Sequence, residues 1–216
     1  MSLINVDQLY IVEPSHPVLS QVAEEVKTNE ITSQFIQDLI KKMMQIAGVE
    51  RENPGKRVLV GLAAPQIGVS KRIILVDTGA NGKGGITNVK VYINPKIISK
   101  SAEETEWYEA CFSTGQVAGI VMRPKIVTIV ALNEKGDEVT ETHADYVARI
   151  FQHEIDHLDG KRFPSLIKDE QKLHWVEKDE FPIYRNQEGW RDWPKKCPKE
   201  KWEAIQKGET AIPSGK

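Results

Sequence analysis

The sequence lacks most features that mark secreted, membrane or nucleic-acid-binding proteins. No apolar run approaches the roughly 20 residues needed to span a bilayer. The first 26 residues contain no Lys or Arg, which excludes an ordinary signal peptide and an arginine-rich transit peptide. Two cysteines allow at most one disulfide, and a net charge of -2 gives no electrostatic case for binding nucleic acid or an anionic membrane. We therefore expect a cytoplasmic protein.

What the chain contains is typical of a globular protein. Its 216 residues are 40% hydrophobic and 28% charged, with 29 basic and 31 acidic side chains. This length is enough for one sizeable domain, with or without an extension.

The pentapeptide His153 to His157, with the sequence HEIDH, indicates a metal site. Residues four apart lie on the same face of an α-helix, so the imidazoles of His153 and His157 can reach one ion. Glu154 lies on the adjoining edge, where a carboxylate can exchange a proton with water that the ion activates. The spacing favours a hydrolase. The alternative is a surface helix with two unrelated histidines.

The helix that carries this motif has recognisable ends. Asp145 is a suitable N-cap and Gly160 is suited to a left-handed C-terminal turn. Glu154 interrupts the apolar stripe of this helix, and a buried carboxylate is costly unless it is paired or lies near a cation. Its position therefore favours function over solvation.

The rest of the chain predicts an α+β fold. Residues 1–27 are expected to form an extended arm with a short strand at Ile11 and Val12, and 50–57 and 79–85 to form loops. An amphipathic helix is expected from Ser33 to Gly48. β-Branched runs then predict strands, at Arg72 to Asp77, Val89 to Ile93, Ile97 to Ile98, Ile126 to Leu132 and Glu138 to Tyr146. We expect mainly antiparallel β-sheets wrapped around a central helix that bears the motif, with the amphipathic helix on the N-terminal side.

Two histidines are too few for a catalytic metal, which usually takes three protein ligands and keeps one position open. Cys111 is the candidate for the third ligand, because a thiolate binds zinc or ferrous iron well. An isolated cysteine is otherwise most often a small buried apolar residue.

Three blocks together resemble the motifs of the peptide deformylase family. They are Gly61 to Gln66 (GLAAPQ), Glu109 to Ser113 (EACFS) and Gln152 to His157 (QHEIDH), in the family's order and approximate spacing. The resemblance extends from about Leu9 to about Leu166. It implies an enzyme that removes the formyl group from the N-terminal formylmethionine of newly synthesised proteins and releases formate.

The resemblance also implies a role for each matching residue. Cys111, His153 and His157 would hold the metal, with Fe²⁺ expected in the cell and Zn²⁺ or another divalent ion as the alternative. Glu154 would be the general acid and base. The side chain of Gln66 and the backbone N–H of Phe112 would bind the developing oxyanion. The substrate would contact three residues, Val60, Gly61 and Ile150.

Some residues depart from the family's pattern. Leu59 and Ala110 replace glycines, and Phe112 stands where a smaller aliphatic residue is common. Trp107 and Tyr108 are bulkier than expected beside the methionine pocket. None of these changes removes a chemical group, so we expect an altered substrate preference rather than a loss of activity.

Two other functions are compatible with the sequence. One is a metallopeptidase of the broader His-Glu-x-x-His kind, which would differ in its third ligand and in cutting internal peptide bonds. The other is a catalytically silent binding module on the same fold, which the complete set of site residues disfavours.

Two expectations concern residues outside the motifs. The resemblance suggests an ion pair between Asp156 and Arg123, although both could instead be solvated surface charges. Residues 1–166 are expected to form the catalytic domain. Residues 167–216 are expected to be an extension that packs on it, with a helix from Lys168 to Glu180. A transient ribosome contact is the other role considered for this extension, and Cys197 within it is not expected to bind metal.

Overall fold

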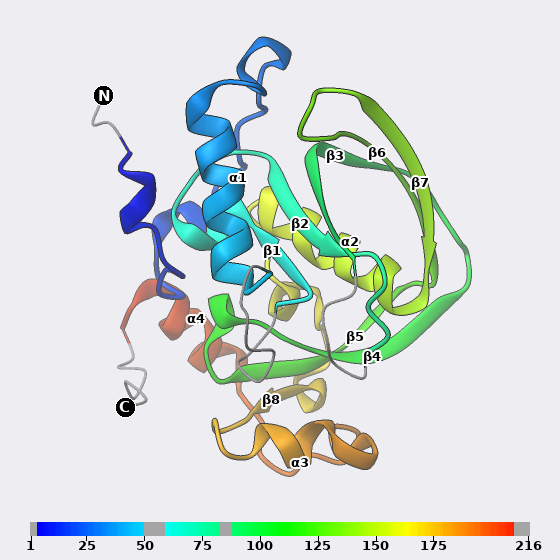
Figure 1. The fold of residues 1–216 in the computed structure, drawn as a ribbon. Coiled ribbons are helices and arrows are strands. Elements are labelled where there is room, and N and C mark those ends of the chain that lie inside the picture. Colours follow the sequence, from blue (N-terminus) through cyan, green and yellow to red (C-terminus); the bar gives the residue numbers. More distant parts are fainter. Residues whose placement is uncertain (1–3, 50–58, 83–87, 210–216) are drawn as a thin grey trace.

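The computed structural model describes residues 4–49, 59–82 and 88–209 (Figure 1). The predicted loop 50–57 and part of the predicted loop 79–85 lie outside these residues. Among the described helices, every one is too short or too polar to cross a membrane.

Helix α1 comprises Gln34–Ala47. The Ser33 hydroxyl accepts a hydrogen bond from the Ile36 N–H, and Gly48 ends the helix with φ 83°, a left-handed conformation that glycine adopts readily. One face is buried, formed by Ile36, Leu39, Ile40, Met43 and Ala47. The apolar periodicity and the two terminal residues thus predict both limits of this helix.

Two antiparallel sheets form the framework, as the sequence predicts. The larger has the order β1-β2-β3-β6-β7, with β1 at Gly61–Ala63, β2 at Ile73–Asp77, β3 at Val89–Lys100, β6 at Ile126–Leu132 and β7 at Glu138–Ala144. The smaller has the order β4-β5-β8, with β4 at Glu104–Ala110, β5 at Val117–Pro124 and β8 at Leu173–Trp175.

Helix α2, Asp145–Leu158, carries both motif histidines and lies between the sheets (Figure 1). It packs against β1, β2 and β7 of the larger sheet and against β5 of the smaller one. The cap predicted at Asp145 is wrong: Asp145 is the first residue of the helix, has φ 52°, and makes no capping bond through its side chain. At the other end Gly160 is left-handed, with φ 68°.

Several strand limits differ from the prediction. The two runs at 89–93 and 97–98 form one strand, β3, whose register shifts near Asn94. Asn94 has φ 52°, and its side chain bonds both backbone groups of Val26. The strand predicted at Ile11 and Val12 is wrong, because Val12 makes a single backbone bond to Gln66 instead of a ladder. Tyr146 belongs to α2 rather than to a strand.

Short 3₁₀ helices connect the larger elements. They lie at Val6–Gln8, Pro17–Ser20, Thr28–Glu30, Ala64–Ile67, Phe112–Thr114, Phe163–Leu166, Glu170–Lys172 and Asn186–Glu188.

The segment after Leu166 contradicts the prediction of a helix from Lys168 to Glu180. Leu173 to Trp175 instead pair with β5 as strand β8, with Leu173 opposite Gly119 and Trp175 opposite Val117. An available strand edge therefore overrides the local helical pattern. Two short helices follow, α3 at Phe181–Arg185 and α4 at Lys199–Lys207.

Three tryptophans of this segment are buried. Trp190, Trp193 and Trp202 are 1%, 7% and 4% exposed. Trp190 and Trp193 pack with Tyr184 against Tyr108 of β4, whereas Trp202 packs with Phe163 and Leu173. The segment thus packs on both faces of the smaller sheet, because the β5 residues in these two clusters alternate along the strand.

His174 of β8 is fully buried at this junction. Its Nδ1 lies 3.0 Å from the Tyr184 hydroxyl, and its Nε2 lies 3.0 Å from the Gln171 carbonyl oxygen and 3.2 Å from Lys196 Nζ. Burial, reinforced by the charge of Lys196, lowers the pKa of His174 to about 4.

We predict that acid weakens the fold through His174. Because its pKa is lower in the folded chain, the unfolded chain binds this proton first, so stability is lost as pH falls from about 6.5 towards 4. A His174→Gln variant should lack this component, which amounts to at most about 1.4 kcal/mol per pH unit. Urea unfolding across this range measures it. Equal pH slopes in the two proteins would contradict the prediction.

Candidate metal centre

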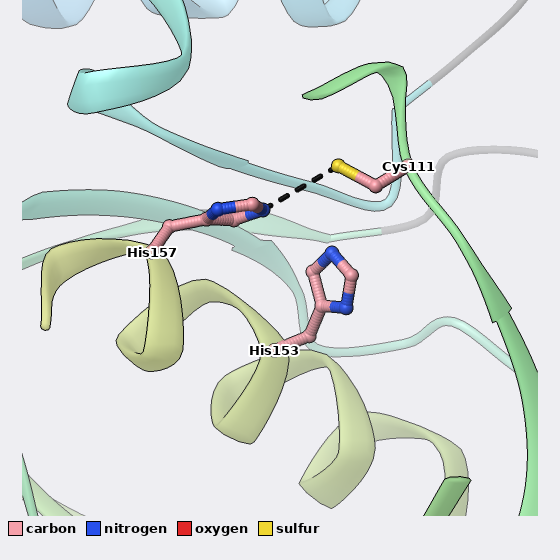
Figure 2. A group of neighbouring side chains, drawn as sticks. All are labelled: Cys111, His153 and His157. Carbon is pink, nitrogen blue, oxygen red and sulfur yellow. Dashed lines mark hydrogen bonds between the residues drawn. The ribbon is translucent and has the colours of Figure 1, made fainter. Parts of the chain in front are cut away.

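Three potential metal ligands converge where β4 meets α2. Ligand atoms of Cys111, His153 and His157 all lie within 4.8 Å of one another, and Cys111 Sγ lies 3.4 Å from His157 Nε2. Figure 2 shows both imidazole rings, from successive turns of α2, directed towards the cysteine that follows β4. The spacing of four residues puts the two imidazole rings on one face of α2, and the smaller sheet positions the Cys111 thiol opposite them.

The donor set suits a divalent transition metal. One thiol and two imidazoles match the preferences of Zn²⁺ and Fe²⁺. No second cluster of this kind occurs in residues 4–49, 59–82 and 88–209. Cys197 is buried beside Trp202 and is not part of the group.

Glu109 orients His153. Its Oε2 lies 2.9 Å from His153 Nδ1, which leaves the other ring nitrogen to face the centre. The Glu109 side chain is buried and binds the guanidinium of Arg123 through two hydrogen bonds of 2.6 and 2.9 Å, and Arg149 through one of 2.8 Å. Burial alone would raise the pKa of Glu109, but Arg123 holds it well below its usual range.

Sequence reasoning assigned no role to Glu109 or Arg149. The sequence could have indicated Glu109, because it lies two positions before the candidate ligand Cys111. Residues two apart in a strand have side chains on the same side. Arg149 has no such signal. It is a buried cation on α2 that also donates to the carbonyls of Val121 and Thr105.

The expected ion pair between Arg123 and Asp156 is confirmed. Arg123 Nη1 lies 2.8 Å from Asp156 Oδ2, and the side chains are 6% and 19% exposed. The alternative, two solvated surface charges, is wrong. Arg123 also donates from Nε and Nη2 to Glu109, so one guanidinium joins β4, β5 and α2.

Gln66 lies against the ligand group with its amide nitrogen directed at it. The side chain is 3% exposed, and Nε2 lies 3.2 Å from Cys111 Sγ and 3.3 Å from Ser113 Oγ. Its Oε1 accepts the Ala63 N–H at 2.7 Å, which fixes the orientation of the amide. Ser113, which is fully buried, was not singled out in the sequence.

Glu154 is buried without a full set of partners. The residue is 4% exposed, and Oε2 has no hydrogen-bond partner in the described structure. Burial raises the pKa of its carboxyl to about 7. An orphaned carboxylate oxygen beside three ligands fits a site that takes a cation and water.

Gly61 of β1 lies directly against this carboxylate. A Cβ at this position would be 2.4 Å from Glu154 Oε1 and 2.8 Å from Ile150 Cγ2. Only glycine therefore permits the close approach of β1 to α2. Val60 is half-buried and packs on the same cluster as Ile150, and Phe112, which follows Cys111, is 43% exposed.

The structure explains four of the residues that differ from the family's usual pattern, namely those at positions 59, 107, 108 and 110. Neither Leu59 nor Ala110 has positive φ, so neither position requires glycine for its backbone. Tyr108 turns away from the ligands and packs edge-on to Tyr184, 5.5 Å between ring centroids. Trp107 lies 5.7 Å from the ring of Trp190. Both bulky residues thus contact the C-terminal segment.

Comparisons with known proteins agree with this architecture. The family model described as polypeptide deformylase matches residues 8–173. A peptide deformylase of Pseudothermotoga lettingae is 40% identical over 158 residues, which is 73% of this chain and 81% of that protein. Peptide deformylase 2 of Clostridium perfringens is 39% identical over 163 residues, 76% of this chain and 95% of that protein.

A solved structure shares the fold. The class I type b peptide deformylase from Acinetobacter baumannii, in its Met-Ala-Ser-bound crystal structure, superimposes with a TM-score of 0.65 at 32% sequence identity. The similarity covers 77% of this chain and 100% of that chain. The family match ends at residue 173, so most of the C-terminal segment 167–216 lies beyond it.

We predict strong coupling between Arg123 and Asp156. Because the pair is largely buried, a double-mutant cycle with Arg123→Ala and Asp156→Asn should give an interaction energy of about 1–3 kcal/mol in urea unfolding. Lys125 and Glu103 form an exposed pair of the same 2.8 Å length and serve as the control, with roughly 0–1 kcal/mol expected. Additive losses at 123 and 156 would refute the coupling.

Proposed function

Because the chain belongs to the polypeptide deformylase family, whose members are enzymes, we propose that it removes the N-formyl group from N-terminal formylmethionine of newly synthesised proteins and releases formate. The observation that carries this proposal is the convergence of Cys111, His153 and His157 beside Glu154. Gln66 completes the arrangement with an amide directed at the same point.

Cys111, His153 and His157 would hold a divalent metal. When bound there, the metal supplies Lewis-acid activation of water and of the formyl oxygen. Fe²⁺ is the ion we propose for the cell, on the strength of the family resemblance, and the same ligands suit Zn²⁺. Glu109 fixes the ring of His153 in the orientation that such binding needs.

Glu154 is the proposed general acid and base. Its buried carboxyl, with a pKa raised to about 7, can take a proton from water and return it to the leaving amine near neutral pH. The contact with Gly61 and the packing of Ile150 hold the group in place.

The amide of Gln66 and the backbone N–H of Phe112 are the proposed oxyanion donors. As water adds to the formyl carbon, negative charge develops on the formyl oxygen, and fixed N–H dipoles stabilise it. The bond from Ala63 to Gln66 Oε1 keeps the NH₂ of this amide turned towards the ligands. Removing one such donor in other enzymes has cost on the order of 10²–10³ in rate.

The peptide part of the substrate is proposed to pair with β1. This strand lies at the edge of the larger sheet, so its free backbone groups can accept an added strand at Gly61. Val60 and Ile150 would contact the methionine side chain. The similar Acinetobacter baumannii enzyme was crystallised with Met-Ala-Ser, a tripeptide that begins with methionine.

The cellular setting follows from this activity. A deformylase of nascent chains would work in the cytoplasm and meet its substrates at the ribosome, with transient ribosome contact. We propose that residues 1–166 form the catalytic domain and that 167–216 form an extension packed on it, with the burial of Trp190 and Trp202 in support.

Formate release from formyl-Met-Ala-Ser tests the proposal. Protein purified without oxygen should contain iron and release formate. Cys111→Ala should lose both metal and activity, whereas Glu154→Gln should keep the metal and lose about 10²–10⁴-fold in kcat. Elemental analysis and a coupled formate assay measure both properties.

Other outcomes of this assay have distinct meanings. Full activity with zinc as the only metal found would overturn the assignment of iron. A Cys111→Ala protein that keeps metal and activity would overturn the ligand set. Cleavage of internal peptide bonds would indicate a metallopeptidase, and the absence of any hydrolysis would indicate a binding module.

We predict that Gly61→Ala selectively impairs catalysis. The new methyl group would displace the Glu154 carboxylate, so kcat should fall by at least about 10-fold. Gly119→Ala is the matched control, because its Cβ would meet Ile167 Cδ1 at the same 2.4 Å and would not contact Glu154. Both variants should unfold at lower temperature. Equal specific activities in the two variants would contradict the prediction.

A further inference from the structure

Helix α4 follows the residues matched by the family model and contacts the catalytic region through Trp202. Trp202 is 4% exposed, and the centroid of its ring lies 4.9 Å from the guanidinium carbon of Arg162. This distance is within the range of a cation–π contact, which strengthens when the cation is shielded from water.

Arg162 is an unusual buried cation. It is 3% exposed, and in the described part of the chain no carboxylate forms an ion pair with it. Its hydrogen bonds go to neutral oxygens: the Pro14 carbonyl at 2.5 Å, the Ser113 carbonyl at 3.1 Å and the Ser20 hydroxyl at 3.3 Å. A buried charge is costly, so the aromatic face of Trp202 and these acceptors are needed to hold it there.

The bond to Ser113 links Arg162 to the metal ligands. The Ser113 carbonyl accepts from Arg162, while the Ser113 hydroxyl accepts from Gln66 Nε2 at 3.3 Å. The same Gln66 nitrogen lies 3.2 Å from Cys111 Sγ. A continuous path of contacts therefore runs from Trp202 through Arg162 to the segment Cys111 to Ser113.

Two residues of α4 pack near the ligand segment and differ in chemistry. Trp202 and Ile205 are both buried on α4, and both belong to the apolar cluster against which Cys111 packs. Of these two, Trp202 has the aromatic ring that faces the Arg162 guanidinium. Substitutions at these two positions can therefore distinguish a loss of fold stability from a specific effect on the segment Cys111 to Ser113.

We propose that Arg162 and Trp202 are positioning residues for the segment Cys111 to Ser113, so that helix α4 sets the geometry of the metal-ligand group. Loss of the aromatic face would let the guanidinium turn towards water and release the Ser113 carbonyl. Cys111 and Gln66 would then lose their fixed positions. The inference rests on the proposed function in taking Cys111 as a metal ligand.

Cobalt binding to the full-length protein tests the proposal without substrate. Titration with Co²⁺ is followed by the sulfur-to-cobalt charge-transfer absorption, which reports the bond to Cys111. Trp202→Leu and Arg162→Lys should each weaken Co²⁺ binding by about 10–100-fold, the usual effect of removing a residue that orients a metal ligand. Trp202→Phe, which keeps an aromatic face, should restore affinity to within roughly 3-fold of the unaltered protein.

Ile205→Ala is the matched control for stability. It should lower the melting temperature as Trp202→Leu does, yet change Co²⁺ affinity by less than roughly 3-fold, because it leaves Arg162 in place. Equal affinity losses in Trp202→Leu and Ile205→Ala, no loss in Trp202→Leu, or no rescue by Trp202→Phe would each overturn the proposal. Formate release by the unaltered protein is measured separately, so a wrong substrate and a wrong positioning role remain distinguishable.

Discussion

The buried carboxylate of Glu109 organises the interactions around the candidate metal centre. It receives hydrogen bonds from Arg123 of β5 and Arg149 of α2, and it contacts the ring of His153. An isolated buried carboxylate would be strongly destabilising. These three partners, which come from different elements, stabilise it. Their convergence fixes β4, β5 and α2 relative to one another, and Cys111 follows Glu109 by two residues. The positions of Cys111 and His153 thus depend on the groups that compensate the negative charge of Glu109.

A second constraint is the narrow contact between β1 and α2. Gly61 leaves no room for any side chain between the strand and Glu154, and Ile150 closes the gap on one side. The carboxyl is buried here, and its burial raises its pKa to about 7. The fold therefore produces two opposite electrostatic environments close together. Glu109 is kept ionised by cations, whereas Glu154 is left with an oxygen that has no hydrogen-bond partner in the described structure.

Sequence patterns predict the parts of this structure that depend on local periodicity. The limits of α1, the pairing of β6 with β7 and the shared face of His153 and His157 all follow from spacing and turn residues. Cys111 was recognised because a catalytic metal needs a third ligand and because its block resembles a motif of the peptide deformylase family. Arg149, Ser113 and Arg162 were not, because a polar residue acquires such a role only through partners that the fold brings from distant segments. Their types and spacing do not distinguish them from surface residues.

The C-terminal segment illustrates the same limit at the level of secondary structure. Leu173 to Trp175 lie in a stretch whose apolar spacing favours a helix, yet they form a strand because β5 offers unpaired backbone groups. Pairing with β8 closes that edge and leaves β4 as the outer strand on the side that leads to Cys111. In the larger sheet β1 is likewise an outer strand, and it carries Gly61. Two outer strands, β1 and β4, therefore lie next to the candidate ligands, and an outer strand has unpaired backbone groups that can pair with an added chain.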